Sequence, residues 1–396
     1  MNEIEFSVMY HNDQSLAALE GLIKEFEAAS HIHVRLRVLN WADAWSELVK
    51  VALYKQGPDV SEIGSTWLGD FARMLALHNF NTADIRSLGG ADTFLPAIWS
   101  SAIQPEANQI WGIPWIADTR VIFYRRDYLQ QAGIEEETAF QSHASLVDAL
   151  EKLHQAGFAQ PWTVPTHRSR MTLHNVASWV WGAGGSFLSP DGKQTDFASS
   201  ESIQGITNYY SLARYLDRGA LDLDDTQSDG LYASGKAAMT ISGTWILSPQ
   251  TTPPNILANT GFAPPPGIPY VGGSHLVLWR HSSNENTALE LVRYLCQPEI
   301  QNAYCQVIGL LPTKLDALAS LTYNDSPFYH RLIEKLKSGR SFRPLPLWGM
   351  VEDKLTAALS QIWSDLIKDP NTDIASDVAL TLQPLGRRLN IALSGQ

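Results

Sequence analysis

The first 64 residues alternate between short apolar segments and amphipathic segments, and this alternation constrains the fold more than any other feature. Residues 4–10 and 34–38 alternate apolar and polar side chains, and residues 60–64 form a short third segment, so all three read as strands. Residues 16–26 and 42–54 carry apolar side chains at helical spacing. This strand–helix–strand–helix–strand order predicts a parallel sheet with right-handed crossovers.

The loops that follow these three strands are candidate ligand contacts, because open parallel sheets bind ligands beyond the carboxyl ends of their strands. None of them contains the Gly-x-Gly-x-x-Gly of a dinucleotide site. Helix capping accounts for one or two of the loops, but each one also holds an aromatic residue, which favours ligand contact. The candidate residues of these loops are His11, Asn12, Asp13, Asn40, Trp41, Ser65, Thr66 and Trp67.

Residues 111–133 indicate a crossing between two structural units. Pro114 forces an extended approach to the polar trio Asp118-Thr119-Arg120, after which residues 121–124 read as a strand. Trp111 and Trp115 flank the crossing. A ligand held between two lobes and a buried turn with an ion pair fit this pattern equally well.

Composition excludes several classes of partner. The net charge of −12 argues against nucleic acid or an anionic membrane surface, and there is no apolar run of about 18 residues that would predict a membrane span. The 13 tryptophans among 396 residues suit the flat C–H faces of sugars, although large cores also use tryptophan. A neutral small ligand remains compatible with all of this.

The cysteines and the start of the chain leave alternatives open. Only Cys296 and Cys305 are present, which excludes a disulfide-rich scaffold and a thiolate zinc cluster. A disulfide between them and two free buried thiols are equally compatible with their spacing. No export signal precedes the first strand, so we expect either a mature exported chain or a cytoplasmic protein.

Two motifs that suggest chemistry are weak. Residues 230–237 nearly match a phosphate-binding loop, but Ala237 stands where a serine or threonine would bind Mg²⁺, so we predict no nucleotide site. His167 and His174 flank Arg168 and Arg170 in a basic loop that could face an anion, although an ion-paired or solvated loop is favoured. No other catalytic or metal-binding motif occurs, so we expect no cofactor and no enzyme activity.

The rest of the chain predicts helices over 172–185 and 199–216 and a strand over 239–241. Further crossings are expected at Pro264 and Pro312. Together the crossings predict an N-terminal lobe of residues 1–114 plus 264–312 and a C-terminal lobe of residues 115–263 plus 313–396, with the ligand cleft between them.

An ordered set of short segments resembles the extracellular family 1 solute-binding proteins of sugar ABC transporters, the maltose-binding-protein superfamily. The similar segments cover nearly the whole chain, and each is weak alone. They are Gly57–Val60, Gly112–Pro114, Tyr124–Asp127, Trp181–Gly185, Phe197–Ser200, Gly235–Met239, Gly243–Trp245, Pro264–Pro266, Gly272–Gly273, Pro298–Gln301, Gly309–Pro312, Phe342–Pro344 and Trp348.

This resemblance implies an α/β fold of two lobes that close on a ligand, each lobe a mostly parallel sheet flanked by helices, joined by a multi-strand hinge. It implies that Asp118 binds sugar hydroxyls and that Trp67, Trp245 and Trp348 are aromatic contacts, with Trp245 and Trp348 in the second lobe. The remaining candidate site residues are Arg120, Arg170, His174, Trp181, Thr244, Gly273, Ser274, His275 and Arg343.

The resemblance also implies a function. It predicts a monomer in the periplasm or outside the cell, lipid-anchored in some precursors, that hands an oligosaccharide to ABC permease subunits. Arg120 and the Arg168–Arg170 loop depart from a neutral site. They keep open a glycerol 3-phosphate, glycerophosphodiester or acidic-sugar ligand, and a carbohydrate-processing enzyme is the more distant alternative.

Overall fold

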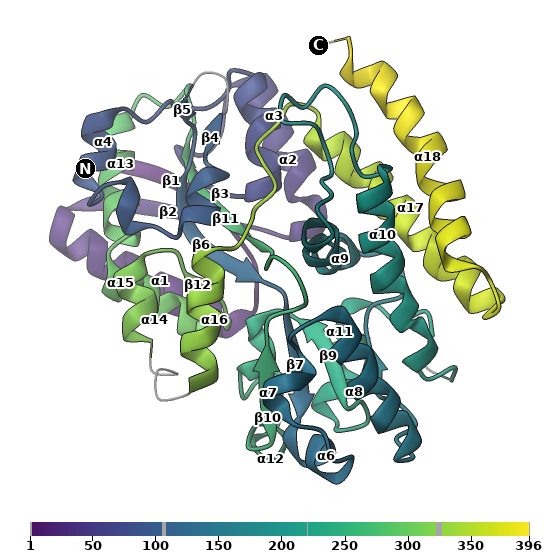
Figure 1. Cartoon of the computed structure of the whole chain (residues 1–396). Coiled ribbons are helices and arrows are strands. Elements are labelled where there is room, and N and C mark those ends of the chain that lie inside the picture. Colours follow the sequence, from purple (N-terminus) through teal and green to yellow (C-terminus); the bar gives the residue numbers. More distant parts are fainter. Residues whose placement is uncertain (1, 105–107, 220, 322–326, 396) are drawn as a thin grey trace. The chain divides into compact units, whose positions relative to one another are not determined.

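The chain forms two compact units, each built from separate stretches of sequence. The computed structural model describes every residue except 1, 105–107, 220, 322–326 and 396 (Figure 1). Unit 1 comprises Met1–Asp118, Val271–Tyr329 and Gly339–Gly349, and unit 2 comprises Thr119–Tyr270, His330–Ser338 and Met350–Gln396.

The unit boundaries differ from the predicted ones. The chain leaves unit 1 after Asp118 rather than at Pro114, and it returns after Tyr270 rather than at Pro264. Pro312 is not a boundary, because the chain stays in unit 1 up to Tyr329. Prolines mark where the backbone is extended, but the crossings themselves lie further along the chain.

Two segments predicted for the second lobe belong to unit 1, and hydrogen bonds give the reason. The Thr313 hydroxyl donates to the carbonyl oxygen of Pro114 at 2.8 Å. The Val271 N–H donates to the carbonyl oxygen of Arg340 at 2.9 Å, which ties the segment Gly339–Gly349 to the same unit. Contacts with residues far away in the sequence therefore decide the unit to which each late segment belongs.

The first elements of unit 1 follow the predicted alternation, which confirms the three strands and two helices. Each apolar stripe read from the sequence is buried, as in Leu19, Ile23 and Phe26 of the first helix. The elements are β1 (Asn2–Met9), α1 (Asp13–Ser30), β2 (Ile32–Leu39), α2 (Trp41–Tyr54) and β3 (Val60–Gly64).

Among the described residues, the main sheet of unit 1 has the order β12-β6-β11-β3-β1-β2, with β6 (Ile113–Thr119), β11 (Val271–Leu278) and β12 (Leu311–Pro312). Strand β1 pairs in parallel with β2 and β3, as predicted. Strand β11 pairs antiparallel with β3, and β12 pairs antiparallel with β6. The sheet is therefore mixed rather than mostly parallel, because β11 runs back along β3, with Ser274 opposite Gly64 and Leu278 opposite Val60.

Helices cover both faces of this sheet. Helices α1, α13 (Glu285–Leu295) and α14 (Pro298–Ile308) bury their apolar side chains on one face, and α2 and α3 (Leu68–Arg73) do so on the other. Cys296 and Cys305 lie in the first of these cores and are both free, which resolves the question of a disulfide. The smaller elements of unit 1 are α4 (Thr82–Ser87), α5 (Pro96–Ser100), β4 (Ile103–Gln104), β5 (Gln109–Ile110) and α15 (Leu315–Ser320).

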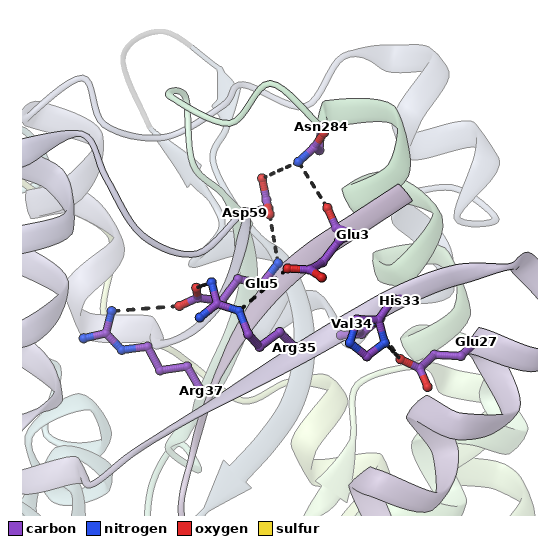
Figure 2. Close-up of polar contacts among 9 residues, drawn as sticks. All are labelled: Glu3, Glu5, Glu27, His33, Val34, Arg35, Arg37, Asp59 and Asn284. Atoms are coloured by element: carbon purple, nitrogen blue, oxygen red, sulfur yellow. Dashed lines mark hydrogen bonds and ion pairs between the residues drawn. The ribbon is translucent and has the colours of Figure 1, made fainter. Parts of the chain in front are cut away.

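Charged side chains protect the edge strand β2 (Figure 2). Arg35 Nη2 lies 2.5 Å from Glu5 Oε2, and Arg37 Nη2 lies 3.0 Å from Glu47 Oε2. Glu27 accepts hydrogen bonds from the N–H of Val34 at 2.8 Å and lies 2.7 Å from His33 Nδ1. Charges along an exposed edge discourage pairing with a strand of another molecule.

The sheet of unit 2 is also mixed. Its described strands have the order β10-β7-β9-β8, in which only β8 and β9 are parallel. The predicted strands 121–124 and 239–241 are confirmed as β7 and β9. The strands are β7 (Val121–Arg125), β8 (Trp162–Thr163), β9 (Met239–Ser242) and β10 (Thr260–Ala263).

The helices of unit 2 outnumber its strands. Helix α10 (Ser200–Tyr210) packs against α9 (Arg170–Gly182) and α18 (Ile374–Leu393) (Figure 1). Both α9 and α10 are shorter than predicted, because a 3₁₀ turn follows α10 and Ala183 caps α9. The others are α6 (Arg126–Gln131), α7 (Glu136–Ala139), α8 (His143–Gln155), α11 (Asp225–Ala233) and α12 (Pro254–Leu257), while α16 (Pro327–Lys337) and α17 (Trp348–Lys368) each begin in unit 1.

In the described parts of the chain, no helix is both long and apolar enough to cross a membrane.

Candidate functional site

The predicted loop contacts of unit 1 share one edge of its sheet. Strands β1, β2 and β3 are parallel, so their carboxyl ends lie together. Gly112, just before β6, approaches His275 of β11, and Ile116 of β6 approaches Gly273 of β11. Strand β6 therefore runs antiparallel to β11. Because β11 is also antiparallel to β3, strands β6 and β3 run in the same direction. Asp118 is the second-to-last residue of β6 and therefore lies at the same edge of the sheet. We call this edge the carboxyl edge of unit 1.

Aromatic rings form a continuous cluster at the carboxyl edge. The ring centroid of Trp41 lies 6.5 Å from that of His11 and 5.5 Å from that of Trp67. Trp45, which the sequence analysis missed, lies 5.6 Å from Trp67 on the other side. Trp41 is 38% exposed and Trp67 only 2%, so the Trp41 ring has a solvent-exposed surface and the buried Trp67 ring packs against it.

His11 and Asp118 lie close enough to interact electrostatically. Burial lowers the pKa of His11 to about 4, and the negative charge of Asp118 opposes this shift. The imidazole is therefore uncharged at neutral pH. Its Nε2 atom is buried and has no hydrogen-bond partner among the described residues. An uncharged imidazole beside a carboxylate is suited to hydroxyl groups, which both donate and accept hydrogen bonds.

The other loop residues divide between capping and burial. Asn12 caps α1 by accepting a hydrogen bond from the Ser15 N–H at 2.8 Å, so the capping interpretation is confirmed for this residue. Asp13 accepts a hydrogen bond from the Tyr10 hydroxyl at 2.8 Å. Asn40 precedes α2 but makes no side-chain cap hydrogen bond and is exposed. Ser65 and Thr66 are buried in the 3₁₀ turn after β3.

Of the predicted contacts of β11, Ser274 and His275 are buried and Gly273 is partly buried. Gly273 has φ of +130°, and a Cβ there would come within 2.0 Å of the Ile116 carbonyl oxygen, so only glycine fits. His275 is fully buried, with its Nε2 3.3 Å from Ser101 Oγ. Burial lowers the pKa of His275 to about 4. This position corrects the expectation of a ligand contact and makes His275 an uncharged core residue.

A buried carboxyl lies beside this strand. Glu62 of β3 is 1% exposed, and its Oε2 accepts the Met9 N–H at 2.9 Å. Burial raises the pKa of Glu62 to about 7, while the Met9 N–H and the Ser274 hydroxyl favour the charged form. No pattern in the sequence distinguishes Glu62, because a single glutamate in a short strand looks the same whether it is buried or exposed.

Arg343 and Trp348 lie in unit 1 and not, as expected, in the second lobe. Trp348 is 2% exposed and packs on Phe342, with ring centroids 4.6 Å apart. The Asp70 carboxylate accepts the N–H groups of Leu347 and Gly349 at 3.0 and 3.1 Å. These bonds to α3 hold the segment in unit 1, where Arg343 is exposed.

In unit 2, Trp245 follows β9 in a 3₁₀ turn that begins at the buried Thr244. The indole Nε1–H donates to Asp229 Oδ2 at 2.7 Å. A Cβ on Gly243 would come within 2.0 Å of Trp245 Cζ3, so the ring lies directly on the backbone of Gly243. The two predicted residues are thus joined by a carboxylate that the sequence analysis did not identify.

Arg120 lies among aromatic rings of unit 2. Its guanidinium carbon is 5.3 Å from the centroid of Trp245 and 5.8 Å from that of Tyr270. His174 stacks on Tyr270 at 4.5 Å, and the Trp181 ring lies 6.4 Å from Tyr270. Four predicted residues are therefore brought together around Tyr270. The sequence analysis missed this tyrosine, although it comes directly before the true crossing.

The basic loop of unit 2 is ion-paired where contacts are known. Arg168 Nη2 lies 2.6 Å from Asp353 Oδ1, and His167 Nδ1 lies 2.9 Å from Asp222 Oδ1. Arg170 is exposed at the start of α9. The ion-paired interpretation is confirmed for Arg168, while the His167 ring lies within hydrogen-bond distance of Asp222. Among the described residues, no group of three or more histidine, cysteine, aspartate or glutamate side chains could hold a metal ion.

Comparison with known proteins gives the family. A sequence model of bacterial extracellular solute-binding proteins matches residues 21–330. The chain belongs to this family. The resemblance found in the sequence is confirmed, and the members of this family are binding proteins.

Named relatives of this solute-binding protein agree with that assignment. The diacetylchitobiose binding protein DasA of Streptomyces coelicolor is 22% identical over 346 residues, which is 84% of this chain and 78% of DasA. The sugar-binding protein MalE of Xanthomonas citri has a similar structure, with a TM-score of 0.83, 20% identity, and coverage of 100% of this chain and 98% of MalE. A solute-binding protein of Thermotoga lettingae bound to α-D-tagatose has a TM-score of 0.81 and 18% identity, covering 99% of this chain and 100% of its own. These likenesses confirm the α/β fold.

Proposed function

We propose that this chain binds a neutral oligosaccharide and delivers it, as a monomer, to the permease of an ABC importer. The observation that carries the proposal is the carboxyl edge of unit 1, where the exposed Trp41 ring adjoins an uncharged His11 and the Asp118 carboxylate. A flat apolar surface beside hydroxyl-binding groups matches the two faces of a sugar. The names of DasA and MalE, which refer to sugars, support the same class of ligand.

The surroundings of Arg120 favour a neutral ligand over the anionic alternatives. Arg120 lies close enough to Asp225 and Asp229 that its positive charge favours the ionised form of both. Arg168, one of the two arginines of the basic loop, is paired with Asp353. Because the charges of these arginines are already balanced by carboxylates, an added phosphate or carboxylate would face negative charge as well as positive.

A ligand panel tests the proposal. The purified chain is screened by thermal shift with N,N′-diacetylchitobiose, cellobiose, maltotriose, raffinose, glycerol 3-phosphate and glucuronate, because a ligand that binds the native state alone raises its stability. We expect a neutral oligosaccharide to give the largest shift, with an affinity that hardly changes between low salt and about 0.5 M salt. Stabilisation by the two anions alone, lost as salt rises, would contradict the neutral ligand. The bound sugar is recovered chemically unchanged if the chain only binds it.

Replacing Asp118 with alanine is expected to weaken binding of the best sugar by about 1.5–3 kcal/mol, the effect of losing a hydrogen bond to a charged group. Isothermal titration calorimetry measures the change. Glu20→Ala, on the exposed side of α1, is the matched control and should bind as the wild type does. Unchanged affinity in a folded Asp118→Ala protein would mean that Asp118 has only a structural role.

A further inference from the structure

The indole of Trp245 is fixed from several directions within unit 2. Its Nε1–H donates to Asp229 at 2.7 Å, and its benzene ring rests on Gly243, where any Cβ would clash. The guanidinium of Arg120 lies 5.3 Å from the ring centroid. A half-buried tryptophan that needed only apolar packing would not require a carboxylate at its N–H.

Asp229 occupies an unfavourable place for a carboxylate. Burial raises its pKa to about 6, and the neighbouring charge of Asp225, one turn earlier on α11, raises it further. The Trp245 N–H, the Ser242 hydroxyl and the Arg120 charge oppose the shift and favour the ionised form. The Asp225 carboxylate makes a different contact, because it accepts a hydrogen bond from Ser169 Oγ at 2.6 Å.

We propose that Asp229 is a positioning residue that holds the Trp245 indole in the single orientation needed to contact the sugar. The proposal rests on the function proposed above. A carboxylate forms a shorter and stronger hydrogen bond to the indole N–H than a neutral acceptor does. Its negative charge also interacts favourably with the positive charge of Arg120 beside the same ring.

The proposal predicts opposite effects on affinity and on stability. Since the pKa of Asp229 is raised in the folded chain, its contribution to stability is greatest below about pH 4 and is lost as pH rises through about 6. Asp229→Asn should therefore leave the melting temperature at pH 8 equal to or above that of the wild type. The same variant should bind the best sugar of the panel about three- to tenfold more weakly at pH 8. A residue with a purely structural role would lower both.

The first experiment needs no ligand. Indole N–H resonances are recorded by ¹⁵N TROSY NMR between pH 5 and pH 8, and Trp245→Phe identifies the Trp245 signal by its absence. We expect this signal to shift with a midpoint near pH 6 in the wild type and to lose that shift in Asp229→Asn. In the control Asp225→Asn, which removes an equal charge one turn away, the signal should still titrate, with a lower midpoint. A Trp245 signal that ignores both pH and Asp229→Asn would overturn the proposal.

The second experiment measures binding of the best panel sugar by calorimetry at pH 5, 6, 7 and 8. Wild-type affinity should fall as pH drops through 6, and Asp229→Asn should be uniformly weak across this range. Equal affinity and an equal pH profile in the two proteins would refute the positioning role even if the NMR signal titrates. Failure of the proposed function looks different, because no panel sugar would then bind the wild type at any pH while the Trp245 signal still titrated.

Discussion

Replacing Trp67 with alanine is expected to lower the free energy of unfolding by about 3–5 kcal/mol, the usual cost of truncating a buried tryptophan. The ring is 2% exposed and lies against Trp41, at 5.5 Å, and Trp45, at 5.6 Å, so its removal leaves a cavity beneath the carboxyl edge of unit 1. Urea unfolding followed by circular dichroism measures the change.

Trp41→Ala is the informative comparison, because it removes the exposed member of the same pair. This variant should lose only about 1 kcal/mol of stability, for its edge contacts with Trp67 and His11, while sugar binding weakens by about 2 kcal/mol or more. If instead Trp67→Ala unfolds within about 1 kcal/mol of the wild type, then Trp67 does not support the cluster.

Replacing Glu62 with glutamine is expected to stabilise the chain by on the order of 3 kcal/mol at pH 8, for a shift from an ordinary pKa near 4.5 to about 7. The pKa of Glu62 is raised in the folded state, so its contribution to stability is complete below about pH 4.5 and lost as pH rises through 7. The wild type should therefore weaken over this window, and Glu62→Gln should not. Glutamine also keeps an oxygen for the Met9 N–H.

Urea unfolding at pH 5, 6, 7 and 8 measures the difference between the two proteins, which should grow with pH. Glu20→Gln, an exposed substitution on α1, should show no such growth. A constant difference across the series would show that Glu62 does not titrate in the folded chain as its burial implies.

The fold of residues 1–64 could be predicted from the sequence because its determinants are local. Strand β3 begins and ends where the apolar segment does, at Val60 and Gly64, and α1 contains the predicted apolar stripe. The three loops met at one edge because parallel strands place their carboxyl ends together.

The predictions that were wrong, and the residues that were missed, depend on contacts between distant parts of the sequence. Nothing near Trp348 indicates that Asp70, 277 residues before Leu347 and 279 before Gly349, accepts hydrogen bonds from these neighbours of Trp348. Likewise His275 is polar and follows a glycine pair, but its position opposite Ile63 in the middle of a sheet makes it a core residue. Tyr270 and Asp229 were missed because their roles depend on the rings and charges that folding brings to them.

The position of β11 has a consequence for how the chain matures during synthesis. This strand lies between β6 and β3, yet its residues Val271–Leu278 follow all of the first unit 2 segment, Thr119–Tyr270. When the ribosome has made only the first 118 residues, β3 and β6 each lack the neighbour that will separate them, and their backbone groups are open to other chains. Synthesis must therefore continue past Asp118 to Leu278 before β11 can take its place between β3 and β6. Because unpaired strand edges are prone to aggregation, this interval is the one in which we expect the nascent chain to be most aggregation-prone.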